Sequence, residues 1–180
     1  MFIRLFFSFI VLLTIAGCAT PPNYDMNAVA LVAGEKSRLG QPLITAKCSF
    51  VQAQTGELVG GGMRHGLCIA FNTAFVYRSI DINDPMNGNS TIFYYPIINN
   101  IGISAPNMLG VKQFVISTNV NSNGFIFRPN EGLGYSNEKA YEFLDLLKTK
   151  NLKLINEPIF INQSNAGGDT YIFTTVNKKK

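Results

Sequence analysis

Hydrophobic residues are arranged through the middle of the chain in a pattern that predicts mainly β-strands. Between residues 42 and 129, segments rich in β-branched and aromatic residues alternate with clusters of Gly, Asn, Asp and Pro. The last two segments are expected to pair as a hairpin across Asn123-Gly124. The predicted strands are Leu43–Gln52, Leu67–Ile80, Ser90–Ile98, Val111–Asn119 and Gly124–Arg128.

Two segments have the periodicity of helices. The stronger one, Asn137–Lys150, can be capped by Ser136 or Asn137, and its apolar residues recur at the spacing of one buried face: Ala140, Phe143, Leu144 and Leu147. A short helix is also predicted over Asn27–Lys36, with one face formed by Ala28, Leu31 and Val32.

These elements predict one α+β domain over residues 28–177, a mainly antiparallel β-sandwich or barrel with one long amphipathic helix. Two strands are expected after that helix, over Lys153–Ile161 and Thr170–Val176. Pro158 makes the first of them an edge strand or a bent strand.

The stretch Val111–Lys150, a late hairpin followed by SNEKAYEFLDLLKTK, resembles the pleckstrin-homology-like barrel. The resemblance is one of pattern, and it implies a curled sheet whose open end is filled by the helix. The chain departs from that family by adding two strands after the helix. A more general α+β sandwich is therefore the alternative.

Residues 1–17 have the features of a secretory signal peptide. Arg4 provides a short positive region, and the apolar run Leu5–Ile15 ends too early for a membrane-spanning helix, which needs about 20 apolar residues. Small residues and prolines follow the run, as expected near a cleavage site.

The sequence Ile15-Ala16-Gly17-Cys18 resembles the lipobox of bacterial lipoproteins. The resemblance implies cleavage before Cys18, lipidation of Cys18, and a lipidated tether over residues 18–27. Because Ala19 rather than Asp follows the cysteine, it also implies attachment to the outer membrane, with the domain facing the periplasm or the cell surface. The alternative is an ordinary signal peptide with a chance cysteine.

If Cys18 carries lipid, Cys48 and Cys68 remain as an even pair in an oxidising compartment. Both lie in predicted strands, and we expect them to form a disulfide. Two buried free thiols are the alternative.

Composition narrows the possible functions. The 180 residues are 47% hydrophobic and 14% charged, which excludes a wholly disordered chain. The formal charge of +4 is modest, and an envelope location excludes nucleic acid as a partner. The tail Lys178–Lys180 could lie against an anionic membrane surface, although a solvated tail is the simpler interpretation.

Few segments suggest chemistry, and we expect no cofactor and no metal site. The glycine loop Gly60–Gly62 lacks the spacing of a phosphate-binding loop, and His65, the single histidine, is expected in an exposed loop. Asp81, Asn83, Asp84, Asn87 and Asn89 offer oxygen ligands without the spacing of a calcium loop.

A hydrolase would need two carboxylates brought together by the fold. The candidates, which fall mostly in predicted turns or on the polar face of the helix, are Glu57, Asp81, Asp84, Glu131, Glu142, Asp145, Glu157 and Asp169.

The preferred functional hypothesis is a non-catalytic, lipid-anchored envelope module that contacts a protein partner or an envelope component. The alternative is a periplasmic hydrolase acting on a cell-wall or lipid substrate through carboxylates. A third hypothesis, carriage of a small apolar ligand, would need an internal cavity. The cluster Phe93-Tyr94-Tyr95 could line a ligand groove, although strand core is the simpler interpretation.

Overall fold

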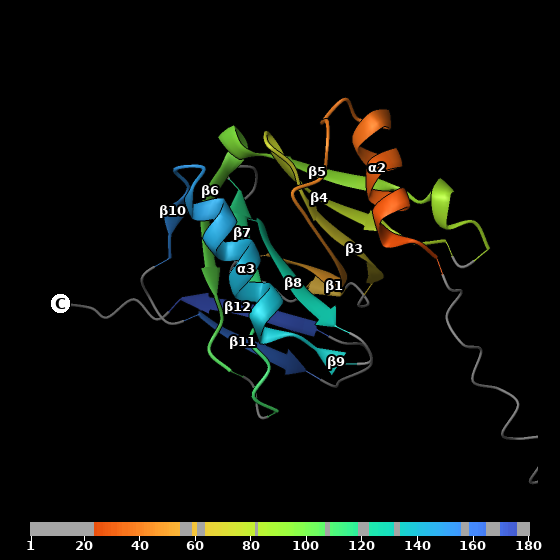
Figure 1. Ribbon diagram of the computed structural model, residues 1–180. Coiled ribbons are helices and arrows are strands. Elements are labelled where there is room, and N and C mark those ends of the chain that lie inside the picture. The colour runs from red at the N-terminus through yellow and green to blue at the C-terminus, as the bar shows by residue number, and fades with distance from the viewer. Residues whose placement is uncertain are drawn as a thin grey trace, which may run out of the picture.

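The computed structural model contains two helices and two β-sheets in its described part (Figure 1). It describes residues 24–54, 59–60, 64–81, 83–106, 109–118, 123–131, 134–155, 159–164 and 170–175. The predicted signal peptide, the residue Cys18 and the basic tail lie outside these residues. The helices are α2 (Met26–Lys36) and α3 (Asn137–Lys148), and two 3-10 turns are η2 (Pro85–Asn87) and η3 (Tyr95–Ile97).

The larger sheet has nine strands in the order β10-β6-β7-β8-β1-β3-β4-β5, with β9 paired to β8. Its pairs are antiparallel except β10 with β6. The strands are β1 (Ile44–Gln54), β3 (Arg64–Ala70), β4 (Ala74–Ser79), β5 (Ser90–Tyr94), β6 (Ile98–Ile103), β7 (Phe114–Thr118), β8 (Asn123–Glu131), β9 (Gly134–Tyr135) and β10 (Lys153–Leu154).

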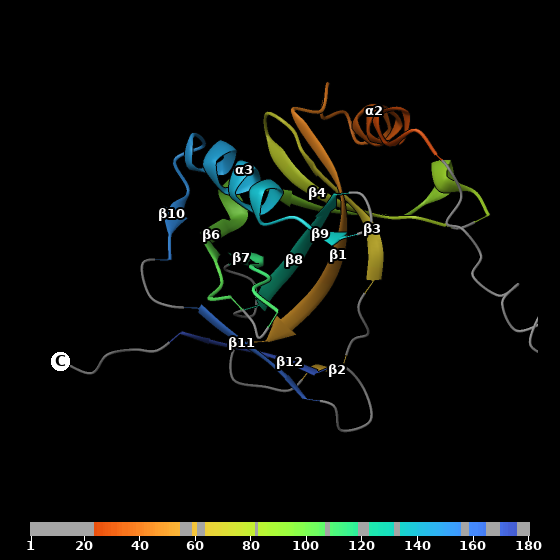
Figure 2. The same cartoon turned by 60° about the horizontal axis from the view of Figure 1, so that its bottom comes forward.

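A smaller sheet pairs β11 (Ile159–Ser164) with β12 (Thr170–Thr175), and β12 with β2 (Val59–Gly60). Strand β12 contacts β1, and Figure 2 shows the smaller sheet lying beneath the end of β1. The predicted strand Thr170–Val176 is thus present as β12, whereas the predicted strand Lys153–Ile161 divides. Its beginning is β10 in the larger sheet, and its end belongs to β11 in the smaller one.

The larger sheet curls around a core of aromatic rings. Phe93 of β5 contacts Phe125 of β8 at a centroid distance of 4.6 Å, and Phe75 of β4 contacts Phe127 of β8 at 4.8 Å. These strands are separated by at least two others in the sheet order, so the sheet must bend to bring them together. We call the side that holds these rings the inner face. The sheet is open, with β10 and β5 at its two edges. The α+β class and the mostly antiparallel sheet are confirmed, but a closed barrel is not formed.

Helix α3 covers the inner face. Ser136 caps it by accepting a hydrogen bond from the Lys139 amide at 3.1 Å, as predicted. The apolar stripe points into the aromatic core, where the Phe143 ring lies 5.7 Å from that of Phe75. All four predicted positions, Ala140, Phe143, Leu144 and Leu147, are buried.

Helix α2 packs on the opposite, outer face of β3 and β4. Asp25 caps it, and its buried residues are Val29, Ala30, Ala33 and Gly34, so the predicted face of Ala28, Leu31 and Val32 is wrong. Gly34 allows a close approach on this face, because a Cβ there would lie 2.3 Å from the Gly40 carbonyl oxygen and 2.8 Å from the Phe71 ring. Because the helix begins at Met26, its first two residues fall within the segment predicted as a tether.

Two predicted strands are in fact pairs of elements. The segment Leu67–Ile80 contains β3 and β4, joined at residues 71–73. The segment Ser90–Ile98 is broken by η3 at Pro96, and strand β6, which the sequence does not predict, begins after this turn. β3 and β4 are buried between α2 and the aromatic core, so both of their faces are apolar. A strand buried on both faces shows no alternation that would reveal its end.

The predicted hairpin of β7 and β8 is present, and Ser117 pairs with Gly124. Asn123 and Gly124 therefore begin strand β8 instead of forming the turn. Helix α3 ends at Lys148, two residues before the predicted end.

Substitution Phe75→Ala is expected to lower the free energy of unfolding by about 3–5 kcal/mol, because Phe75 is fully buried and contacts four other rings. Urea unfolding followed by far-UV circular dichroism measures this change. Tyr94→Ala is the matched control: Tyr94 is 46% exposed, and its loss is expected to cost about 1 kcal/mol or less. Equal losses for the two variants would contradict the assignment of the core.

Substitution Gly66→Ala is expected to destabilise the pairing of β3 with β4. The added Cβ would lie 2.1 Å from the Arg78 carbonyl oxygen, and strand backbone cannot move away cheaply. A loss of about 1–3 kcal/mol or more is expected. Gly134→Ala makes the same chemical change at a position with open space and should leave the unfolding midpoint unchanged.

Candidate functional site

Among the described residues, a serine and a histidine meet on the outer face. Ser49 of β1 lies opposite His65 of β3, and its Oγ is 3.0 Å from the His65 Nδ1. His65 is exposed, but Ser49 is only 1% exposed. A nucleophile must reach its substrate, so this buried hydroxyl does not form a working serine–histidine dyad. His65 was expected in a loop; it lies on strand β3 instead.

Ser49 belongs to a row of buried polar residues on the outer face, together with Arg128, Gln113 and Ser104. Arg128 of β8 lies opposite Ser49, and its Nε donates to the Gln113 Oε1 at 2.8 Å. The backbone N–H of Gln113 donates to the Ser104 Oγ at 3.0 Å. Buried polar groups that are satisfied in this way fix side-chain positions and are ordinary structural features. The sequence gives no signal for this row, because its members come from four separate strands or loops.

Arg78 is a second buried polar group, and it holds the segment around η2 against α2. It is 2% exposed, and its guanidinium donates to the Met86 carbonyl at 2.6 Å and to the Ser90 Oγ at 3.3 Å. Lys36 of α2 donates to the same carbonyl at 3.3 Å. Burial lowers the pKa of Arg78, and Asp84 partly opposes this shift. A guanidinium stays charged under these conditions, so Arg78 is a structural cation.

The Asp and Asn residues considered as oxygen ligands lie in turns. The Asp81 carboxylate accepts from the Asn83 amide at 2.8 Å, and the Asp84 carboxylate accepts from the Met86 amide at 3.1 Å, which caps η2. Within the part of the chain that the structure describes, no group of three or more His, Cys, Asp or Glu residues could hold a metal ion.

The described carboxylates of the hydrolase hypothesis are dispersed. On α3, Glu142 pairs with Lys139 at 2.6 Å and Asp145 pairs with Lys148 at 2.7 Å, whereas Glu131 accepts from the Ser136 hydroxyl at 3.3 Å. Glu57, Glu157 and Asp169 lie outside the described residues, as do Gly61 and Gly62 of the glycine loop. Gly60 belongs to β2. Glu142 and Glu131 both act on the Lys139 ammonium and raise its pKa, so these two candidates lie near one partly exposed lysine.

The inner face is filled by side chains. Phe50 stacks on Tyr77 with 4.5 Å between ring centroids, and burial raises the pKa of Tyr77 to about 12 although Arg64 opposes the shift. In the described structure its hydroxyl has no hydrogen-bond partner. The contacting rings give no support to an internal ligand cavity. Phe93 and Tyr95 belong to this core, as the simpler interpretation of that cluster expected, and Tyr95 donates to the Phe71 carbonyl.

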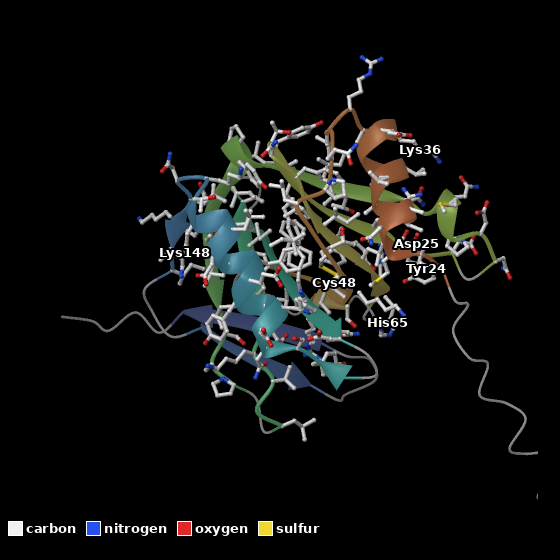
Figure 3. All side chains as sticks on the ribbon, in the orientation of Figure 1. Tyr24, Asp25, Lys36, Cys48, His65 and Lys148 are labelled. Carbon is white, nitrogen blue, oxygen red and sulfur yellow. A yellow bond between two sulfur atoms is a disulfide. The ribbon has the colours of Figure 1, made fainter. Side chains whose placement is uncertain are left out.

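The disulfide lies within this core. Cys48 of β1 and Cys68 of β3 are joined, as predicted, and both are almost fully buried. Figure 3 shows Cys48 in the interior of the sheet. Its burial makes it a structural crosslink between neighbouring strands, because a redox-active cysteine must be accessible.

Strand β5 lies at one edge of the larger sheet. β5 pairs with β4 on one side, and no described strand pairs with its other side. Its residues, Ser90–Tyr94, include no charge and no proline, and Thr91 and Tyr94 are exposed. The opposite edge, β10, has two residues and begins with Lys153.

Comparisons with known proteins provide a fold likeness. No protein-family model matches the chain, and no curated protein matches it. A crystal structure of the C-terminal domain of an unknown protein from Leishmania infantum is similar, with a TM-score of 0.50 and 13% sequence identity. The match covers 70% of this chain and 97% of that one. At this identity the likeness concerns the fold alone.

No helix in the described residues has the length and apolar character needed to cross a membrane.

Replacing both Cys48 and Cys68 by Ala is expected to lower the free energy of unfolding by about 3 kcal/mol, because the bridge closes a loop between residues 20 apart in sequence. Urea unfolding measures the change, with Cys18→Ser as a control that keeps the bridge. Thiol labelling of denatured, unreduced protein should modify neither Cys48 nor Cys68. Labelling of both would contradict the crosslink.

Proposed function

We propose that this protein is a lipid-anchored envelope binding module without catalytic activity, which contacts a protein partner or another envelope component. Lipid on Cys18 would attach it to the outer membrane, and the folded domain would present its binding surface to the periplasm or the cell surface. The observation that carries the binding role is the unprotected edge strand β5.

Edge strands expose unpaired backbone N–H and C=O groups, and proteins usually protect them with short length, lysine, proline or a covering element. The β10 edge has such protection, since it is two residues long and carries Lys153. The β5 edge has five residues without lysine or proline, and within the described ranges no strand pairs with its outer side. An extended segment of a partner can add to such an edge through main-chain hydrogen bonds. Tyr94, with its exposed ring, would supply side-chain contact beside the added strand.

The hydrolase alternative has less support. A hydrolase would need two carboxylates near one substrate atom. Asp81 and Asp84 accept hydrogen bonds from backbone amides in turns, and Glu142 and Asp145 form ion pairs with lysines on α3.

A relation to the pleckstrin-homology-like barrels is supported by the curled sheet and by α3 against its inner face. The open sheet and the strands after α3 are departures from that pattern.

Photocrosslinking in intact cells tests the proposal. A photoreactive phenylalanine analogue replaces Tyr94 at the β5 edge or, as the control, Tyr141 on α3, which has similar exposure at 46% against 39%. One dominant protein adduct is expected from position 94, with little from position 141. The adduct should weaken when Cys18→Ser removes the anchor.

Equal, diffuse labelling from both positions would contradict β5 as the binding edge. Retention of Cys18→Ser in the membrane at the mature mass would contradict the anchor. The two results are independent, so the edge and the anchor are judged separately.

A further inference from the structure

The backbone groups of β5 alternate between the neighbouring strand and the open edge. The Ser79 amide donates to the Asn89 carbonyl at 2.8 Å, and the Tyr95 amide donates to the Thr73 carbonyl at 3.2 Å. Hydrogen-bonded pairs recur at every second residue of an antiparallel ladder, so the odd-numbered residues of β5 direct their N–H and C=O groups toward β4. The residues whose backbone groups point away from β4, to the open edge, are Ser90, Ile92 and Tyr94.

The side chains of these three residues share the outer face with α2. Ile92 is half-buried and packs against the apolar cluster beneath α2, whereas Phe93 belongs to the aromatic core on the inner face. Tyr94, at the end of the strand, has an exposed ring. The outer side of this edge thus has an incompletely covered aliphatic residue at its centre and an aromatic ring at its end.

Two cations lie at the beginning of the strand. The Arg78 guanidinium donates to the Ser90 Oγ at 3.3 Å and to the Met86 carbonyl at 2.6 Å. The Lys36 ammonium donates to the same carbonyl at 3.3 Å, and Figure 3 shows Lys36 at the end of α2. The nearby carboxylate of Asp84 accepts from the Met86 amide and caps η2. The two ends of β5 therefore differ, with cations at one end and a ring at the other.

An antiparallel copy of β5 fits this arrangement. When a two-fold axis passes beside Ile92, each Ile92 lies opposite its counterpart, and each Ser90 lies opposite the Tyr94 of the second copy. All three outward-directed residues then form hydrogen-bonded pairs, which make about six main-chain hydrogen bonds. A register shifted by two residues would leave some of these groups without a partner, so the Ile92-centred register is preferred.

The same register brings complementary side chains together. Directly opposite side chains are about 4.5–5.5 Å apart, so the Tyr94 of the second copy would lie beside Ser90 and close to the cations at Met86. A cation within about 6 Å of an aromatic ring is attracted to its face. The two-fold axis provides this contact twice, and the two Ile92 side chains would cover each other. Because β5 contains no charged residue, its pairing with itself opposes no like charges.

We propose that the partner at β5 is a second copy of this chain, joined through antiparallel pairing of the two β5 strands about a two-fold axis. This inference rests on the proposed function, because it names the partner of the same edge. Anchoring of both copies through Cys18 to one membrane would raise their local concentration and so favour a pair with a small contact. Each copy would then protect the edge of the other.

Photocrosslinking with two distinguishable copies identifies the partner. The full chain with a photoreactive phenylalanine analogue at position 94 is produced together with a full chain that carries an affinity tag, and intact cells are irradiated. The expected adduct has the mass of two chains, carries the tag, and is linked to the segment around Ser90 of the tagged copy. The same analogue at position 141, on α3, should give little of this adduct.

A matched pair of substitutions tests the pairing itself. Thr91 is exposed and would lie opposite the Phe93 of the second copy, so Thr91→Lys places a charge within the proposed contact. This variant is expected to lower the two-chain adduct about fivefold or more. Leu154→Lys places the same charge on the β10 edge, where Leu154 is also exposed, and should leave the adduct unchanged. Circular dichroism melting shows that both variants are folded.

The outcomes separate this inference from the proposed function. One dominant adduct with a different protein would overturn the pairing of two copies and retain β5 as a binding edge. Diffuse labelling without a dominant adduct would overturn both. Equal losses from Thr91→Lys and Leu154→Lys would also overturn the pairing.

The anchor is separated by crosslinking the purified Cys18→Ser chain from position 94 in solution. The two-chain adduct is expected to increase with protein concentration, because the pairing itself needs no lipid. Absence of this adduct in concentrated protein would overturn the pairing, whatever the result for the anchor.

Discussion

Contacts among buried aromatic rings determine the shape of this domain. Phe75, Phe127 and Phe143 come from β4, β8 and α3, and their rings meet near the centre of the inner face. For these rings to touch, the sheet must curl and α3 must lie across it. Dispersion and the burial of apolar surface both favour this arrangement. The position of each edge strand follows from the same curl.

The same core limits where function can lie. Rings fill the inner face, and α2 covers β3 and β4 on the outer face. The buried side chains of Ser49, Arg78 and Arg128 make hydrogen bonds inside the protein, although the Arg78 Nε and the Tyr77 hydroxyl have no partner in the described structure. Among the described residues, one accessible feature is the unpaired edge of strand β5.

Local patterns predicted the elements that have one buried face. The stripe of α3 and its cap at Ser136 could be read directly, because a helix between core and solvent must alternate with a period of 3.6 residues. The hairpin of β7 and β8 was predicted from a cluster of turn residues. Where both faces are buried, as in β3 and β4, the alternation disappears and the two strands resemble a single one. In α2 the consecutive residues 29–33 are all apolar, so the sequence does not single out the buried face.

The sequence by itself determined the α+β class and the long helix with its buried stripe, because these depend on local periodicity. It predicted the pairing of Cys48 with Cys68 on the condition that Cys18 carries lipid, and the structure contains that bridge. The expectation of a lipid anchor also comes from the sequence alone. Only the tertiary structure decided which strand lies at the unprotected edge, that Ser49 is buried beside His65, and that Lys47 meets Tyr24. Strand order and long-range register bring together residues far apart in the chain, and no local pattern records those contacts.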